Sequence, residues 1–104
     1  MRTITIKHQW ARLIHSGKKR IENRTWKTTL GWILLHSGNP DFSILGIMRI
    51  DGVIEPGQHC DDKYYIGPSV GQKPNYGWII GEYLPLKKPI KNIRGKLGIW
   101  EYEI

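Results

Sequence analysis

The sequence predicts a single α+β domain over residues 1–104 that is mostly β, an antiparallel β-barrel with one or two short helices. Its length of 104 residues suits one hydrophobic core and is too short for two. Twelve glycines and five tryptophans are typical of strands joined by tight turns. Six segments are patterned like strands and one like a helix, and a small barrel of such strands closes its edges on itself.

The first elements are read from the period of the apolar residues. Residues 3–7 alternate apolar and polar side chains, as a half-buried strand does. Residues 8–16 change period and predict a short helix, whose apolar stripe is formed by Trp10, Leu13 and Ile14. Gly17 is placed to end this helix in the left-handed conformation.

A second strand is predicted over residues 20–26, and it has one strongly polar face. A period of two directs four of its side chains to that face: Arg20, Glu22, Arg24 and Trp26. Residues 31–36 form a continuous apolar strand, which the Ser-Gly-Asn-Pro turn at 37–40 closes. Trp32, in this strand, is expected in the core.

The second half of the chain predicts three further strands, over residues 44–54, 76–84 and 97–104. In the first of them, Gly46 and Gly52 are expected at bulges where a small barrel curves. Residues 55–73 have little periodicity and predict a long surface loop, of a kind that is often functional. Residues 85–96 are expected to be a basic connection that contains prolines, and Trp100 is expected in the core.

The net charge of +7 is concentrated at the two ends of the chain. Residues 1–27 hold eight basic side chains against one acid, and residues 87–96 hold five against none. A field of this sign attracts polyanions. No apolar run is long enough to cross a bilayer, so we expect a nucleic acid partner and no membrane. The side chains expected to follow its phosphates are Lys18, Arg20, Lys27, Lys91, Arg94 and Lys96.

The sequence predicts a soluble cytoplasmic protein without cofactor or metal. Its start has no apolar signal core, and Cys60 is the only cysteine, which suits a reducing compartment. Residues 59–62 read His-Cys-Asp-Asp, but four adjacent side chains cannot easily converge on one ion. The same stretch lacks a fixed base that would make Cys60 a nucleophile.

Residues 17–26, Gly-Lys-Lys-Arg-Ile-Glu-Asn-Arg-Thr-Trp, carry the main candidate site. Glu22 can pair with Arg24 and orient its guanidinium, while Lys19 adds a mobile ammonium donor. This trio can grip a phosphate or the polar edge of a base; equally, it can be a salt bridge at the end of a barrel. Further candidate ligand contacts are the rings of Trp10, Trp26, Tyr76 and Trp78 and the strand-end side chains of His36 and Ser37.

Gly17, Lys19, Glu22 and Arg24 match the G-x-K-x-x-E-x-R signature of ASCH domains, and the chain resembles this family of the PUA-like superfamily. The resemblance extends over nearly the whole chain, to residues 10–14, 21–28, 31–37, 76–78 and 89–100. It is weak over residues 55–73. It also departs at His8-Gln9, where many relatives have Gln-Pro.

The resemblance implies a PUA-like barrel with a cleft beside its first helix, lined by the signature residues and suited to RNA or another nucleic acid. On this resemblance we expect RNA rather than DNA. Some ASCH proteins resemble enzymes, among them acetylcytidine amidohydrolases, in which the signature lysine works with a threonine and a downstream glutamate. Here Glu22 stands at the position of that threonine, so the expected nucleophile is missing.

Three hypotheses follow. The first is a module that binds single-stranded or modified RNA, or a nucleotide, in a basic cleft. The second is a metal-independent hydrolase on RNA or a modified nucleoside, with Lys19 as general base or electrostatic stabiliser and Glu22 as proton carrier. The third is a protein-interaction domain in transcription or RNA processing, whose partners the sequence does not identify.

Overall fold

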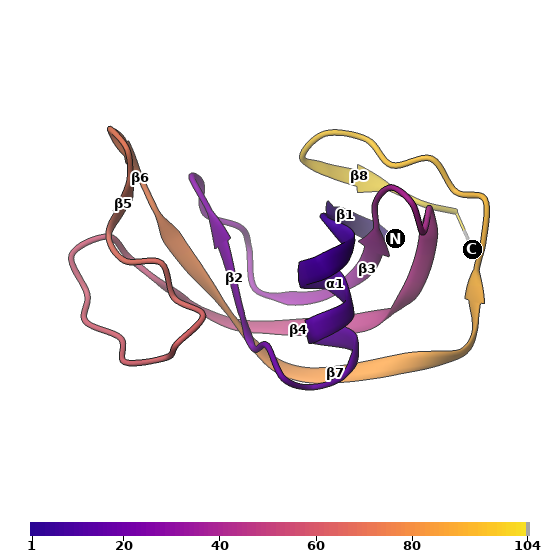
Figure 1. Ribbon diagram of the computed structural model, residues 1–104, viewed down its shortest axis with the longest axis horizontal. Coiled ribbons are helices and arrows are strands. Elements are labelled where there is room, and N and C mark those ends of the chain that lie inside the picture. The colour runs from indigo at the N-terminus through magenta and orange to yellow at the C-terminus, as the bar shows by residue number, and fades with distance from the viewer. Residues whose placement is uncertain (104) are drawn as a thin grey trace.

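A computed structural model describes residues 1–103 and shows a strongly curved six-stranded sheet with one helix (Figure 1). The strand order in the sheet is β2-β7-β4-β3-β1-β8. The helix is α1 (His8–His15), and the strands are β1 (Arg2–Ile6), β2 (Ile21–Arg24), β3 (Gly31–Ser37), β4 (Ser43–Ile54), β7 (Tyr76–Ile90) and β8 (Ile99–Glu101). The short strands β5 (Ser69–Val70) and β6 (Lys73–Pro74) form a separate hairpin, which projects at the end of the molecule away from both termini (Figure 1).

The sheet forms a half-barrel, and this corrects the expectation of a barrel closed on itself. Its strand pairs are antiparallel except β1 with β3, which is parallel. Within residues 1–103, the edge strands β2 and β8 do not pair with each other. Strand β2 has only four residues, and its one strand partner is β7. Its other edge is left facing β1 across an opening.

Two long strands bend the sheet, and glycines mark the bends as the sequence predicts. The register between β4 and β7 shifts between Ile44 and Gly46, and it shifts again on both sides of Ile50, up to Gly52. At Gly46 the chains approach so closely that a Cβ atom would lie 2.6 Å from the carbonyl oxygen of Leu84. Pro85 pairs with Gly46 at this irregularity, where the ladder tolerates a residue without an N–H group. Strand β7 therefore continues to Ile90. Its residues 85–90 belong to the stretch that the sequence predicted to be a basic connection.

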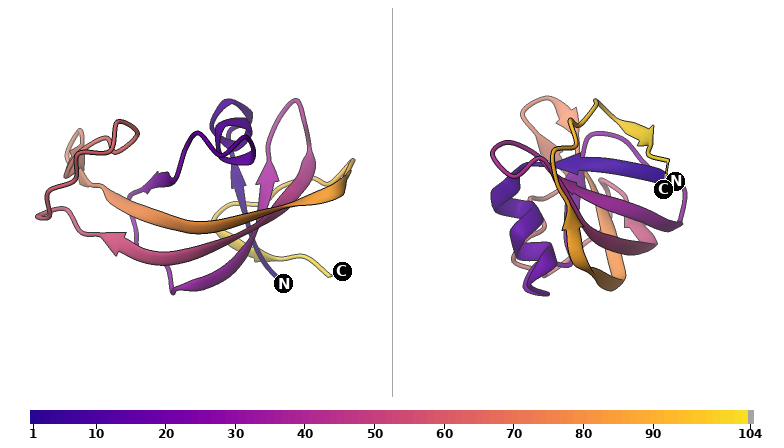
Figure 2. Two further views of the ribbon diagram at one scale, coloured as in Figure 1. Left: turned by 90° about the horizontal axis from the view of Figure 1, so that it is seen from below. Right: turned by 90° about the vertical axis from the view of Figure 1, so that its right-hand side faces the viewer.

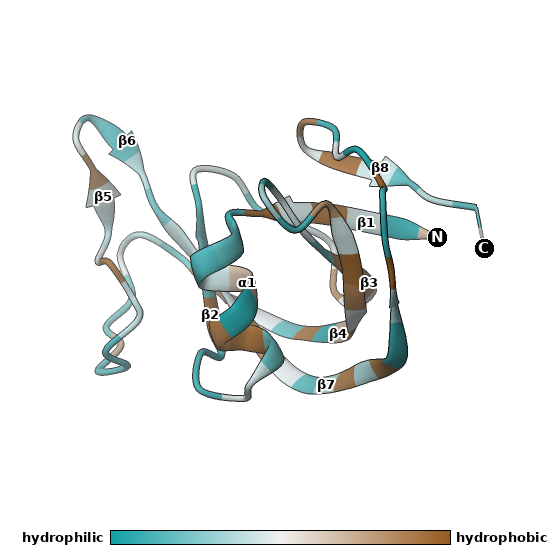
Figure 3. Cartoon of the chain, turned by 45° about the vertical axis from the view of Figure 1, so that its right-hand side comes forward, coloured by the Kyte–Doolittle hydropathy of each residue, from teal (hydrophilic) through white to brown (hydrophobic). Residues whose placement is uncertain are grey.

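Helix α1 lies on the concave side of the curved β4 and β7 ribbons (Figure 2). Apolar and polar residues alternate along both strands, so that one face of the sheet is apolar (Figure 3). The buried core consists of Ile4, Ile6, Ala11, Ile14, Ile33, Leu35, Leu45, Met48, Ile50, Trp78 and Ile80.

Three further expectations meet the structure with different outcomes. Trp100 is buried as predicted, at 8% exposed. The prediction of a core Trp32 is wrong: the ring is 37% exposed on the outer face, with the guanidinium of Arg49 5.5 Å above it. The last strand is shorter than predicted and covers only Ile99–Glu101, while Ile104 lies outside the described residues. In the described part of the chain, the helix is too short to span a bilayer.

Gly46→Ala tests whether close strand contact sets the bend. We expect it to lower the free energy of unfolding by about 1–3 kcal/mol, because the added methyl group would collide with the carbonyl oxygen of Leu84, a backbone atom that cannot move aside, and with the ring of Tyr83. Gly57→Ala is the control, since a Cβ atom there meets nothing within 4 Å. Urea unfolding measures the stability of both variants. Equal free energies of unfolding for Gly46→Ala and Gly57→Ala would contradict the close approach of the strands at Gly46.

Candidate functional site

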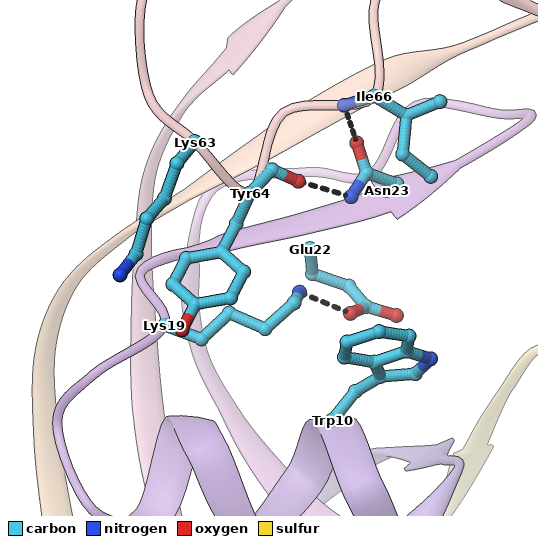
Figure 4. Close-up of a pocket in the computed structure, with 7 residues that line it drawn as sticks. All are labelled: Trp10, Lys19, Glu22, Asn23, Lys63, Tyr64 and Ile66. Atoms are coloured by element: carbon cyan, nitrogen blue, oxygen red, sulfur yellow. Dashed lines mark hydrogen bonds and ion pairs between the residues drawn. The ribbon is translucent and has the colours of Figure 1, made fainter.

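Two adjoining hollows lie between α1, β1, β2 and the loop over residues 55–73. The first has a volume of about 260 Å³ and is lined by Trp10, Lys19, Glu22, Asn23, Lys63, Tyr64 and Ile66 (Figure 4). The second, of about 510 Å³, shares Trp10, Glu22 and Asn23 and continues to Thr5, Arg24 and Asn39. Together we call them the signature cleft, because three of the four signature residues line it.

The fourth signature residue, Gly17, turns the chain into this cleft. Its φ of +81° is left-handed, as predicted, and few residues other than glycine adopt it readily. The N–H of Lys18 donates to the carbonyl of Leu13 and that of Gly17 to Ile14, the hydrogen bonds of a Schellman helix end. The chain then reverses beneath the helix, and Lys19 enters the cleft wall.

The carboxylate of Glu22 joins both signature cations. Lys19 Nζ lies 3.2 Å from Oε1, and Arg24 Nε lies 2.9 Å from Oε2. The side chains of Lys19 and Glu22 are only 4% and 7% exposed, so the pair is almost fully withdrawn from water. Lys19 Nζ also donates to the carbonyl of Ile21. The structure therefore brings the predicted trio together, and the ion pairs hold its polar atoms in fixed positions.

Arg24 bridges the open side of the half-barrel. Its Nη2 donates to the carbonyl oxygen of Thr5 on β1 at 2.9 Å, while its Nε remains on Glu22. Strands β1 and β2 are not paired by backbone hydrogen bonds, so this guanidinium is a direct polar link between them. The cleft floor and the closure of the fold thus use the same side chain.

Asn23, which sequence reasoning did not select, holds the outer wall. Its Nδ2 donates to the carbonyl of Tyr64 at 2.8 Å, and its Oδ1 accepts from the N–H of Ile66 at 3.1 Å. Asn75 reinforces the wall by donating to Asn23 Oδ1 and to the carbonyl of Gly67. This fixes the loop that brings Lys63 and Tyr64 to the cleft. The only sequence signal for Lys63 and Tyr64 is the length of the loop over residues 55–73, which contains both.

The predicted aromatic contacts separate into two groups. Trp10 lines both hollows and is 43% exposed, so its ring is accessible. Trp78 is fully buried, stacks edge-on with Trp26 at 4.9 Å and donates from Nε1 to the Trp26 carbonyl. Trp26 and Tyr76 pack against the same core. These three rings are structural, because they belong to the core or pack against it and line neither hollow of the cleft.

His36 and Ser37 are fully buried and line neither hollow of the signature cleft. Trp100 Nε1 donates to Thr5 Oγ1, which contacts His36 Nδ1 at 3.0 Å, and His36 Nε2 contacts the Ile93 carbonyl at 2.6 Å. Since Ile93 O can only accept, Nε2 carries the proton and Nδ1 accepts from Thr5. Burial lowers the pKa of His36 below its ordinary value of 6.5, partly opposed by its hydrogen bond to Ile93. Ser37 donates to Asp41 at 2.7 Å.

Two of the residues expected to follow phosphates have protein partners instead. The guanidinium of Arg20 donates to the carbonyls of Ile80 and Gly81 on β7. Lys27 Nζ donates to the Glu55 carboxylate at 2.8 Å, and this hydrogen bond raises the pKa of Lys27. The other four, which are exposed and form no ion pair within residues 1–103, are Lys18, Lys91, Arg94 and Lys96.

Metal-binding side chains do not gather in groups of three or more anywhere in residues 1–103. In the His-Cys-Asp-Asp stretch, His59 Nε2 lies 2.7 Å from a carboxylate oxygen of Asp61, and both side chains are exposed. The chemistry that the cleft offers is hydrogen bonding and charge from Lys19, Glu22, Asn23 and Lys63, beside two aromatic rings.

Comparisons with known proteins agree with this architecture. The family model of the ASCH domain matches residues 4–95. The crystal structure of ASCH from Zymomonas mobilis superposes with a TM-score of 0.72 at 16% identity, covering 98% of this chain and 87% of that chain. Two single-substitution variants of that protein each give a TM-score of 0.71, at 15% and 16% identity; both cover 98% of this chain, and the covered shares of the variant chains are 87% and 89%. No curated protein sequence matches. The likeness confirms the predicted mostly-β fold.

Glu22→Gln tests the central role of this carboxylate. We expect a loss of about 3–5 kcal/mol in the free energy of unfolding, because Lys19 is left buried without its counter-charge. Lys19→Met is the matched variant and should cost less, since Glu22 keeps Arg24. Urea titration measures both; a larger loss for Lys19→Met would contradict the arrangement.

The buried His36 predicts a pH-dependent stability. Because its pKa is lowered in the fold, the unfolded chain binds more protons, so stability is retained above pH 6.5 and lost as the pH falls below it. Burial, with Arg12 nearby, lowers the pKa of His15 too, so the stability loss from both should appear together. Unfolding between pH 7 and 5 should show a shallower loss in His36→Gln and in His15→Gln. An unchanged slope in His36→Gln would contradict this assignment.

Proposed function

The chain belongs to the ASCH domain family, and from this premise we propose that its signature cleft binds single-stranded RNA, holding one ordinary or modified base. The observation that carries the proposal is the placement of two aromatic rings around a buried polar set. In Figure 4 the ring of Trp10, on α1, and the ring of Tyr64, on the loop, lie to either side of the Lys19–Glu22 pair. A base that enters this space meets aromatic faces and fixed polar atoms together.

Stacking supplies affinity in such a site and the polar atoms supply selectivity. Aromatic stacking is worth about 1–3 kcal/mol per base and tolerates any base. Glu22 presents carboxylate oxygens to the hollow, and Lys19 presents an ammonium donor, so both kinds of base-edge group find a partner. Because Lys19, Glu22 and Arg24 already hold one another, binding requires little reorganisation.

Charge around the cleft favours a ligand with phosphates. Lys63 lines the first hollow, its Nζ 5.1 Å from the centre of the Tyr64 ring. Lys7 lines the second hollow and is exposed. With a net charge of +7 over 104 residues, the protein attracts RNA from a distance.

A hydrolase acting on RNA or on a modified nucleoside is the second candidate. It is favoured by the carboxylate of Glu22 and the ammonium of Lys19, which line one cavity 3.2 Å apart. In that role Glu22 would transfer protons, and Lys19 would stabilise negative charge on the reacting group.

The test is fluorescence anisotropy of a labelled single-stranded RNA titrated with the wild type and with Trp10→Leu at two salt concentrations. We expect the substitution to weaken binding about 5- to 150-fold, the equivalent of one stacked base. Affinity should also fall steeply with added salt. Trp32→Leu is the matched control, because Trp32 is similarly exposed but lines neither hollow of the cleft.

The outcomes separate the candidates. Equal affinities of Trp10→Leu and the wild type would contradict RNA binding in the signature cleft. Shortened RNA after incubation, absent in the mixture with Glu22→Gln, would favour the hydrolase.

A further inference from the structure

We propose that the loop over residues 91–97 forms a second subsite, which takes an adjacent nucleotide of the same RNA strand. The inference rests on the proposed function and narrows its ligand to a polynucleotide in place of a free nucleoside. Phe42, Arg94 and Lys96 are the residues to which we assign it.

The first argument is that the cleft does not end at the signature residues. Its second hollow shares Thr5, Gly38 and Asn39 with a third hollow of about 380 Å³. That third hollow is lined beyond them by His36, Phe42, Arg94, Gly95, Lys96 and Leu97. A fourth, smaller hollow shares Phe42 and Arg94. The hollows form one groove, which begins at the 55–73 loop, crosses the open side of the half-barrel and ends at the 91–97 loop.

The second argument is that this distant loop is fastened to the core. The N–H of Ile93 donates to the carbonyl of Phe42 at 2.8 Å, and the carbonyl of Ile93 accepts from the buried His36. At Gly95 the backbone lies so close to β1 that a Cβ atom would meet Thr5 Oγ1. Phe42 itself has a φ of +45°, a conformation costly for a residue with a side chain, and the hydrogen bond from Ile93 helps hold it. The loop is thus a preformed surface.

The third argument is the chemistry that this surface presents. Phe42 is 41% exposed and Leu97 is 99% exposed, although both flank a hollow where apolar side chains could have been covered. Arg94 and Lys96 stand beside them and are exposed. An accessible ring and apolar side chain next to two cations match a base and its flanking phosphates.

The ligand of the whole groove is therefore best explained as a single strand of RNA. A nucleoside held in the first hollow, between Trp10 and Tyr64, cannot also reach Arg94, because the second hollow, of about 510 Å³, lies between the first hollow and the third. A continuous phosphate backbone along the groove contacts both ends at once. Linking two weak contacts through one ligand raises the overall affinity without new interactions.

The test compares two probes, cytidine 5′-monophosphate and a single-stranded RNA of about ten nucleotides, within the length that small barrels bind. The variant is the double substitution Arg94→Gln with Lys96→Gln. Its matched control is Lys87→Gln with Lys88→Gln, which removes the same charge from exposed residues of β7 that line none of these hollows. Phe42→Leu is added to remove the ring alone.

We expect the Arg94 and Lys96 double variant to bind the RNA several-fold more weakly than the control pair, and to bind the mononucleotide equally. The slope of log affinity against log salt should be shallower by about 1.4, the value for two lost single-strand contacts. Phe42→Leu should weaken the binding of the RNA and leave the binding of the mononucleotide unchanged. Equal RNA affinity of the two double variants would overturn the second subsite, while Trp10→Leu would still weaken both probes. Loss of any Trp10→Leu effect would overturn the proposed function itself.

Discussion

The buried carboxylate of Glu22 is the interaction on which the rest of the molecule depends. It holds Lys19 at 3.2 Å and Arg24 at 2.9 Å, and Arg24 continues to the backbone of β1. A half-barrel leaves its edge strands without mutual hydrogen bonds, and an open sheet edge is a liability. Here a charged side-chain bridge crosses part of that opening. The same three residues therefore stabilise the fold and line the cleft in which we propose that RNA binds.

This arrangement divides the cleft into a rigid floor and accessible walls. The charged floor is buried and internally paired, so it presents polar atoms in fixed positions. The accessible groups come from elements outside the sheet: Trp10 from α1, and Lys63 and Tyr64 from the long loop. The amides of the half-buried Asn23 and the buried Asn75 connect the two parts, because they bind loop carbonyls and each other. A fixed floor with separately supported walls can recognise a ligand without large movement.

Local patterns in the sequence predicted what local physics determines. The helix end at Gly17 and the trio of Lys19, Glu22 and Arg24 depend on residues close in the chain, and the bends at Gly46 and Gly52 are marked by the glycines themselves. The structure contains all of these features. The aromatic contacts were harder to predict. Whether Trp78 faces a ligand or the core depends on how β7 curves against β2, and the role of Asn23 depends on residues some forty positions later.

The way in which Asn23 holds the outer wall has a consequence for how this protein could diversify. Asn23 forms its hydrogen bonds with main-chain atoms of Tyr64 and Ile66, so these bonds do not depend on the side chains at those two positions. The side chains that face the hollow can therefore be exchanged while the backbone stays in place. The backbone that supports the wall is thus independent of the side chains that line the hollow. A new ligand preference can evolve or be engineered at this wall without disturbing the buried charges of Lys19 and Glu22 below it.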